Sequence, residues 1–171
     1  MSSILADGSY DIYSTPNLLG GMDMYGAEDQ ENNLNGTEES DSIVGSNLND
    51  IINGGNGFNY LNGKDGNDTI TGGDDIDFIL GGAGDDVING KGGSDNIFTG
   101  SGKDTIVLEF FDGVDTISDF DVDEDIIRIK GVGADADVKY DEATGKLSVN
   151  GQDIADLGAG LDFDDDNYEI F

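Results

Sequence analysis

A nine-residue period runs through this chain from Gly36 to Val107 and limits what it can fold into. Read in nines, the segment is GTEESDSIV, GSNLNDIIN, GGNGFNYLN, GKDGNDTIT, GGDDIDFIL, GGAGDDVIN, GKGGSDNIF and TGSGKDTIV. The sixth place of each block is an acid or its amide: Asp41, Asp50, Asn59, Asp68, Asp77, Asp86, Asp95 and Asp104. The eighth place is always aliphatic: Ile43, Ile52, Leu61, Ile70, Ile79, Ile88, Ile97 and Ile106. Such a constant phase indicates a repeat architecture.

Each block combines a turn with a short strand. Its first six residues are rich in Gly, Asn and Asp, which tolerate tight turns and positive φ. Its last three place an aliphatic residue between two others, which suits a strand with only the middle side chain inward. The same phase extends back over residues 18–26 and 27–35, where it puts Asp23 and Asn32 at the sixth place and Tyr25 and Leu34 at the eighth.

These blocks resemble the Gly-Gly-x-Gly-x-Asp-x-U-x nonapeptide of RTX proteins, and GGAGDDVIN matches it almost letter for letter. The resemblance implies an all-β fold, a right-handed parallel β-roll in which two blocks make one coil of a two-sheet solenoid. Neighbours on one edge are then 18 residues apart. One edge would carry Asp41, Asn59, Asp77 and Asp95, and the other Asp50, Asp68, Asp86 and Asp104.

A column of stacked carboxylates predicts a bound cation. At the spacing of parallel strands, about 4.8 Å, adjacent carboxylates repel by about 3.5 kcal/mol at an effective dielectric of 20. Oxygen ligands, many of them backbone carbonyls, favour several Ca²⁺ ions. We take the sixth-place residues as ligands, and the turns GKDGND, GGAGDD and TGSGKD as the best formed. Their candidate glycines are Gly63, Gly66, Gly81, Gly82, Gly84 and Gly102.

The hydrophobic content of a block is too small to fold it alone. One buried Ile or Leu stabilises a block by only about 1.5 to 3 kcal/mol, which is small beside the conformational entropy lost when nine residues become ordered. We therefore expect the repeats to be largely unfolded without calcium and to fold on binding it. In blocks with Glu39, Leu48 or Asp75 at the fourth place, a positive φ would be strained or absent.

Composition excludes several functions. With 38 acidic against 7 basic residues, the net charge of −31 opposes binding to nucleic acids and anionic membranes. The chain has no Cys and no His, so thiolate or histidine metal sites and a Ser/His/Asp triad cannot form. The sequence has no run of about 18 apolar residues, the length that would predict a membrane-spanning helix. We expect a protein that is not an enzyme.

The resemblance also bears on export. The start of the chain lacks the positive and apolar regions of a signal peptide. The resemblance to RTX proteins implies type I secretion through an uncleaved C-terminal signal, and LDFDDDNYEIF looks like such a signal. We expect the type I secretion machinery as a partner and an extracellular or cell-surface location. Met1 favours a complete small chain.

The predicted organisation is an N-terminal segment (1–17), the repeats (18–107, with a clear phase over 36–107) and a C-terminal β cap (108–171). Within the cap, residues 136–140 and 146–149 alternate around DEATG and predict a hairpin. The alternating aspartates of DFDVDED fit either a simple acidic turn or a further calcium site; they are Asp119, Asp121, Asp123 and Asp125.

One sheet should expose an apolar outer face built from Tyr60, Phe78, Leu80 and Phe98. Either the N-terminal SYDIYSTPNLL segment or the C-terminal hairpin covers it, or it is a face for self-assembly or a surface partner.

Two functions remain. The first is a secreted calcium-binding protein with a structural or binding role at the bacterial cell surface or in the extracellular matrix. The second is a non-catalytic C-terminal module of a larger secreted enzyme such as a protease, lipase or alginate epimerase.

Overall fold

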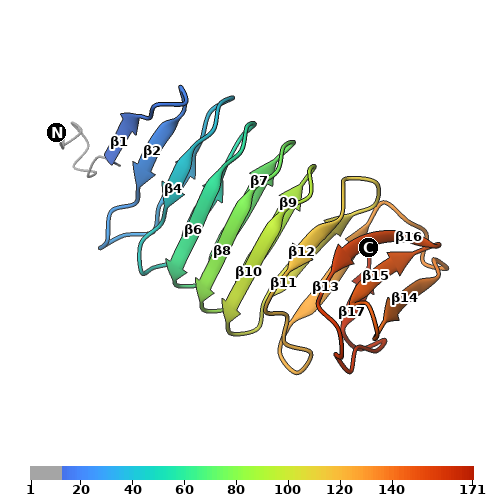
Figure 1. Cartoon of the computed structure of the whole chain (residues 1–171). Helices are drawn as coiled ribbons and strands as arrows, with labels where there is room; N and C mark the ends of the chain where they lie inside the picture. The colour runs from blue at the N-terminus through green and yellow to red at the C-terminus, as the bar shows by residue number, and fades with distance from the viewer. Residues whose placement is uncertain (1–12) are drawn as a thin grey trace.

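Two parallel sheets form the body of the molecule, a flattened solenoid whose strands follow one another along its length (Figure 1). The computed structural model describes residues 13–171. The first sheet contains, in spatial order, β1 (Tyr13–Pro16), β2 (Met22–Tyr25), β4 (Ser42–Val44), β6 (Tyr60–Asp65), β8 (Phe78–Ala83), β10 (Asn96–Ser101), β12 (Asp115–Ile117), β16 (Gln152–Asp156), β15 (Lys146–Val149) and β14 (Val138–Asp141). The second contains β17 (Tyr168–Ile170), β13 (Ile126–Lys130), β11 (Thr105–Glu109), β9 (Val87–Lys91), β7 (Thr69–Gly73), β5 (Ile51–Asn53) and β3 (Asn33–Asn35).

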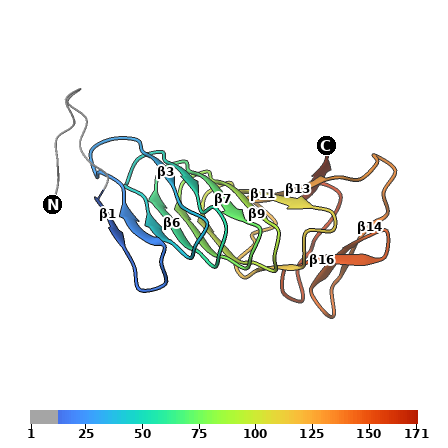
Figure 2. The ribbon, with the colours of Figure 1, turned by 90° about the horizontal axis from the view of Figure 1, so that it is seen from above.

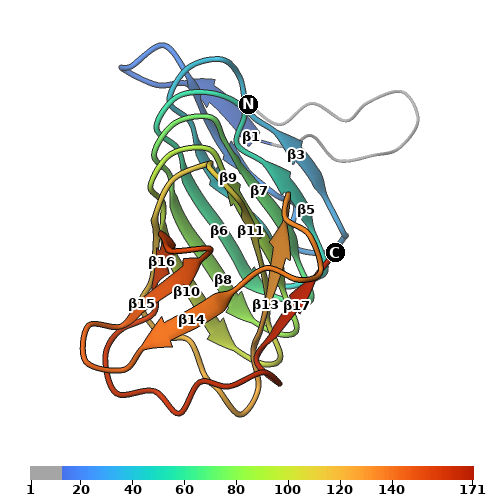
Figure 3. The same ribbon diagram turned by 90° about the vertical axis from the view of Figure 1, so that its right-hand side faces the viewer.

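Successive strands alternate between the two sheets, so each coil takes two blocks. Ile43 pairs with Leu61 in the first sheet and Ile52 pairs with Ile70 in the second, each 18 residues along the chain. Figure 3 views these coils from the C-terminal side. The all-β, parallel β-roll architecture predicted from the repeat is confirmed. Within the described residues, no helix is long and apolar enough to cross a bilayer.

The core is a double row of aliphatic side chains between the sheets. All eight eighth-place residues from Ile43 to Ile106 are at most 1% exposed. Their neighbours at the seventh and ninth places point outward because side chains alternate along a strand. The prediction that only the middle residue of each short strand lies inside is therefore confirmed.

The predicted phase is correct for residues 27–35 but wrong for residues 18–26. Leu34 pairs with Ile52 and is buried, as expected. In β2, however, Met24 pairs with Ile43 and lies inside, whereas Tyr25 is 49% exposed. The turn between β2 and β3, which leads from Gly26 to Asn32, holds one residue more than the later turns. Strand β2 is consequently displaced by one place, and Asp23 pairs with Ser42, a seventh-place residue, so it does not occupy the sixth place.

The roll continues beyond the nine-residue repeat. Strand β12 pairs in parallel with β10, and β13 pairs in parallel with β11. Strands β14, β15 and β16 then form an antiparallel meander that joins the first sheet through β16 (Figure 2). The predicted hairpin is present as β14 and β15. The last strand, β17, pairs with β13, where the Arg128 guanidinium lies 4.1 Å from the centre of the Phe171 ring.

Among residues 13–171, neither predicted cover lies over the apolar outer face of the first sheet. The C-terminal hairpin extends that sheet sideways, and β1 pairs antiparallel with β2 at the opposite end. The remainder of the N-terminal segment, residues 1–12, lies outside the described residues. On the face itself, Tyr60 stacks on Phe78 at 5.8 Å between ring centres, and Phe78 lies 5.6 Å from Phe98.

Candidate metal centre

Each turn is joined to the next by a side-chain oxygen of its sixth-place residue. The Oδ1 atom of a sixth-place residue accepts a hydrogen bond from the backbone N–H of the sixth-place residue 18 positions earlier. On one edge these bonds join Asp50 to Asp68 at 2.7 Å, Asp68 to Asp86 at 2.8 Å, and Asp86 to Asp104 at 2.8 Å. On the other they join Asp41 to Asn59 at 2.9 Å, Asn59 to Asp77 at 2.8 Å, and Asp77 to Asp95 at 2.8 Å. The two sets form two ladders, one along each edge.

Both ladders extend into the C-terminal region through residues that the nine-residue period does not reach. Asp95 donates its N–H to Asp115 Oδ1 at 2.9 Å, and Asp104 donates to Asp125 Oδ1 at 3.0 Å. Their separations are 20 and 21 residues, so a search by phase misses them. The signal that identifies them is an Asp followed two residues later by an Ile. Of the four aspartates in DFDVDED, only Asp125 is buried, and the other three are exposed.

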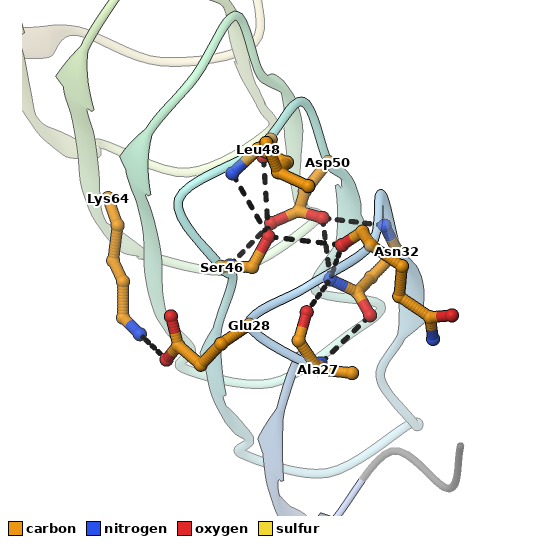
Figure 4. Close-up of polar contacts among 8 residues, drawn as sticks. Ala27, Glu28, Asn32, Ser46, Leu48, Asp50 and Lys64 are labelled. Atoms are coloured by element: carbon orange, nitrogen blue, oxygen red, sulfur yellow. Dashed lines mark hydrogen bonds and ion pairs between the residues drawn. The ribbon is translucent and has the colours of Figure 1, made fainter.

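The second carboxylate oxygen differs between turns. In Asp41, Oδ2 accepts the backbone N–H of Thr37 at 2.6 Å. In Asp50, Oδ2 accepts the backbone N–H of Ser46 at 2.5 Å (Figure 4). In five later turns Oδ2 is buried and has no hydrogen-bond partner: Asp68, Asp77, Asp86, Asp95 and Asp104. A buried anionic oxygen without a partner is costly, so these five atoms mark places where a positive charge is missing from the protein itself.

Burial raises the pKa of the ladder carboxyls, and the hydrogen bonds from the preceding turn only partly offset it. The pKa rises from the ordinary 3.8 to about 6 in Asp68, Asp77 and Asp104. It rises to about 7 in Asp86, Asp95 and Asp115. Because loss of solvation is the main cause, a cation that restores favourable electrostatics would return these groups to the ionised form.

Glycines line the inner side of the turns where the unpaired oxygens lie. A Cβ on Gly63 would come within 3 Å of both Asp68 Oδ2 and the Gly81 carbonyl oxygen. A Cβ on Gly81 would meet Asp86 Oδ2 and the Thr99 carbonyl oxygen in the same way. The absence of a side chain therefore leaves a carboxylate oxygen and a carbonyl oxygen facing the same small space in successive turns.

The other candidate glycines shape the backbone. Gly66, Gly84 and Gly102 occupy the fourth place with φ of 111°, 129° and 128°, and Gly82 occupies the second place with φ of 124°. These values are strained for residues with a Cβ. At the fourth place of the blocks that lack Gly there, positive φ is absent, since it does not occur at Glu39, Leu48 or Asp75.

The donor set fits a hard cation held largely by backbone oxygen. Residues 13–171 contain no cluster of three or more Asp, Glu, His or Cys side chains placed to hold a metal ion. Each turn with a sixth-place Asp instead contributes one buried carboxylate beside carbonyl oxygens, which is the chemistry that Ca²⁺ accepts and softer metals do not favour. The five unpaired Oδ2 atoms and their glycine-lined spaces would hold the ion, whose charge would neutralise the stacked aspartates. Unpaired oxygens occur on both edges, so the preference for the edge of Asp68, Asp86 and Asp104 stays a prediction.

Fold and site together define a parallel β-solenoid with acidic, ion-binding turns. A family model described as the RTX calcium-binding nonapeptide repeat matches residues 28–61, 44–79 and 71–106. This chain therefore carries RTX calcium-binding nonapeptide repeats folded as a β-roll, and such repeats are typical of secreted proteins. Among solved structures, it is similar to the AlgE6R3 subunit of the mannuronan C5-epimerase of Azotobacter vinelandii. The identity is 22%, the TM-score is 0.27, and the match covers 80% of this chain and 66% of that chain. Among curated proteins, none gives a significant match.

Proposed function

We propose that this chain is a secreted protein whose β-roll folds when it binds several Ca²⁺ ions outside the cell. We propose further that it acts there by binding, as a structural component of the cell surface or extracellular matrix, and not as an enzyme. The observation that carries the proposal is the set of five buried Oδ2 atoms without partners in two continuous ladders.

Calcium makes the folded state favourable because it removes the free-energy cost of burying those unpaired carboxylate oxygens. Without the ion, folding buries stacked carboxylates that repel one another and have lost their water. With the ion, the same oxygens become ligands, and the binding free energy is added to the free energy of folding. Extracellular calcium modules bind with dissociation constants of about 10⁻⁴ to 10⁻³ M. Such affinity would leave the chain unfolded at low intracellular calcium, a state suited to passage through type I secretion machinery.

A binding role agrees with how the acids are used. Every acidic side chain that is buried within residues 13–171 belongs to one of the two ladders, including Asp115 and Asp125. The surface that we assign to contact with a second copy or another surface partner is the outer face of the first sheet, where Tyr60, Phe78 and Phe98 form a continuous aromatic row.

The test is a calcium titration of metal-free protein, followed by circular dichroism and light scattering together. We expect the chain to lack β structure in excess chelator and to gain it cooperatively between about 10⁻⁴ and 10⁻³ M calcium. Light scattering in the same samples reports whether folding is accompanied by association. Magnesium at equal concentration is the control, since its preference for a small octahedral shell makes it a poor substitute. Full β structure in excess chelator at neutral pH and low salt would falsify the proposal.

A further inference from the structure

Two turns carry an amide where the others carry a carboxylate, and the amide changes what the turn requires. Asn59 is fully buried and lies in the same ladder position as its acidic neighbours. Its Oδ1 accepts the N–H of Asp41 at 2.9 Å, just as an aspartate does. Its Nδ2 occupies the position of the second carboxylate oxygen beside the first-place glycine, since a Cβ on Gly54 would meet Asn59 Nδ2 as a Cβ on Gly63 would meet Asp68 Oδ2.

This nitrogen is a donor in a place where aspartate offers only an acceptor. Asn59 Nδ2 donates to the carbonyl oxygens of its own turn, at 3.0 Å to Gly57, 3.4 Å to Asn56 and 3.5 Å to Gly55. A carboxylate at this position could not donate to any of them. In the five turns from Asp68 to Asp104 the corresponding oxygen has no partner at all.

Asn32 repeats the arrangement at the N-terminal end of the other ladder (Figure 4). Its Nδ2 donates to Gln30 O at 2.9 Å and to Ala27 O at 3.2 Å, again within its own turn. The same nitrogen also donates to Asp50 Oδ1 at 2.8 Å, which provides that carboxylate with a further protein donor. Each of the two turns thus contains a buried side-chain amide that donates hydrogen bonds to the carbonyl oxygens of its own turn.

We propose that the amides of Asn59 and Asn32 take the place of a calcium ion, so that these turns are closed without metal while the turns from Asp68 onward require it. The polarity of the site explains the exchange. A calcium ion and an N–H₂ group are both positive partners for converging oxygens, but only the amide is covalently part of the chain. These two turns, in the N-terminal half of the roll, then need no ion of their own when calcium binding by the later turns folds the chain. This inference rests on calcium binding by the repeats and assigns which turns take part.

The test exchanges amide and carboxylate, which differ little in size. Asn59→Asp should bind at least one more calcium ion per chain than the unchanged protein, as counted by native mass spectrometry at saturating CaCl₂. The folding equilibrium of this variant should also depend more steeply on calcium concentration, because more ions are taken up on folding. Asp77→Asn, in the next coil of the same ladder, should bind at least one ion fewer and remain folded.

Leucine at the same positions provides matched controls, because it fills similar space and neither donates nor ligates. At saturating calcium, Asn59→Asp should keep a Tm close to that of the unchanged protein, while Asn59→Leu should melt at a lower temperature. Asp77→Leu should likewise melt below Asp77→Asn. An unchanged ion count in Asn59→Asp, or a loss of Tm as large as in Asn59→Leu, overturns the inference. If the unchanged protein itself binds no calcium, the proposed function fails instead, so the two failures are distinguishable.

Discussion

Acidification of the calcium-free protein is expected to restore β structure that calcium otherwise supplies. The reason is the raised pKa of the buried ladder carboxyls, for which loss of solvation is the main cause. A carboxyl whose pKa is higher in the folded than in the unfolded chain binds more protons when folded. The free energy of unfolding therefore falls as pH rises between the two pKa values. The six groups with values of about 6 or 7 place this window between about pH 4 and pH 7: Asp68, Asp77, Asp86, Asp95, Asp104 and Asp115.

The size of the effect follows from the same values. Between pH 7.5 and pH 5, a carboxyl with a folded pKa of about 6 and an unfolded pKa of 3.8, such as Asp68, gains about 1 kcal/mol of stability. One with a folded pKa of about 7, such as Asp86, gains about 2 to 3 kcal/mol. Three groups of each kind give on the order of 10 kcal/mol, comparable to the total stability of an ordinary domain.

Circular dichroism and urea unfolding of metal-free protein at pH 5.0 and pH 7.5 measure this directly. The lower pH stays above the isoelectric point of about 4.1, where precipitation would interfere. We expect more β structure and a higher urea midpoint at pH 5.0. With calcium present the order should reverse, because protons compete with the ion for the same oxygens. A metal-free chain that is more stable at pH 7.5 than at pH 5.0 would contradict the reasoning.

Three further results are expected in saturating calcium. Ile79→Ala, at a fully buried position, should lower the free energy of unfolding measured in urea by about 2 to 5 kcal/mol. Ile76→Ala, at a side chain that is 48% exposed, should change it by less than about 0.5 kcal/mol. Gly82→Ala should lower Tm more than Gly160→Ala, because both have positive φ but only the first would press a Cβ against the backbone of the neighbouring coil. Phe78→Ser should leave the circular dichroism spectrum unchanged and reduce the association measured by light scattering. If the variant loses its β structure, the aromatic row stabilises the fold and is not a contact surface.

The repeat in the sequence predicts the regular part of this molecule well because period and geometry coincide there. An aliphatic side chain at the eighth place of a short strand is shielded from water only if it points between the two sheets. The pattern alone therefore places Ile43 through Ile106 inside. The 18-residue separation within each ladder follows once two blocks make a coil. The inward position of Met24 could not be predicted in this way, since one extra residue in the turn after Gly26 changes the phase without changing the composition.

The missed ladder members have a similar explanation. Asp115 and Asp125 follow longer connections than the repeat allows, and Asp125 comes directly after a run of acids that remain at the surface. The Asp-x-Ile pattern is present at both positions, but the pairing of β12 with β10 and of β13 with β11 is what places them in the ladders. The donor role of Asn59 was equally hidden, because in the sequence it is merely a neutral replacement for Asp. The hydrogen bonds of its Nδ2 give it a function of its own.

The alternation of blocks between two sheets restricts how the length of such a chain can change. Insertion or deletion of 18 residues adds or removes a whole coil and leaves every later strand on its original side. A change of nine residues would transfer all later strands to the opposite side and present the C-terminal meander to the wrong sheet; between Phe78 and Phe98 it would also separate these two rings. Variants of this protein should therefore tolerate length differences in multiples of two blocks, and single-block changes should be rare between the aromatic row and the C-terminus.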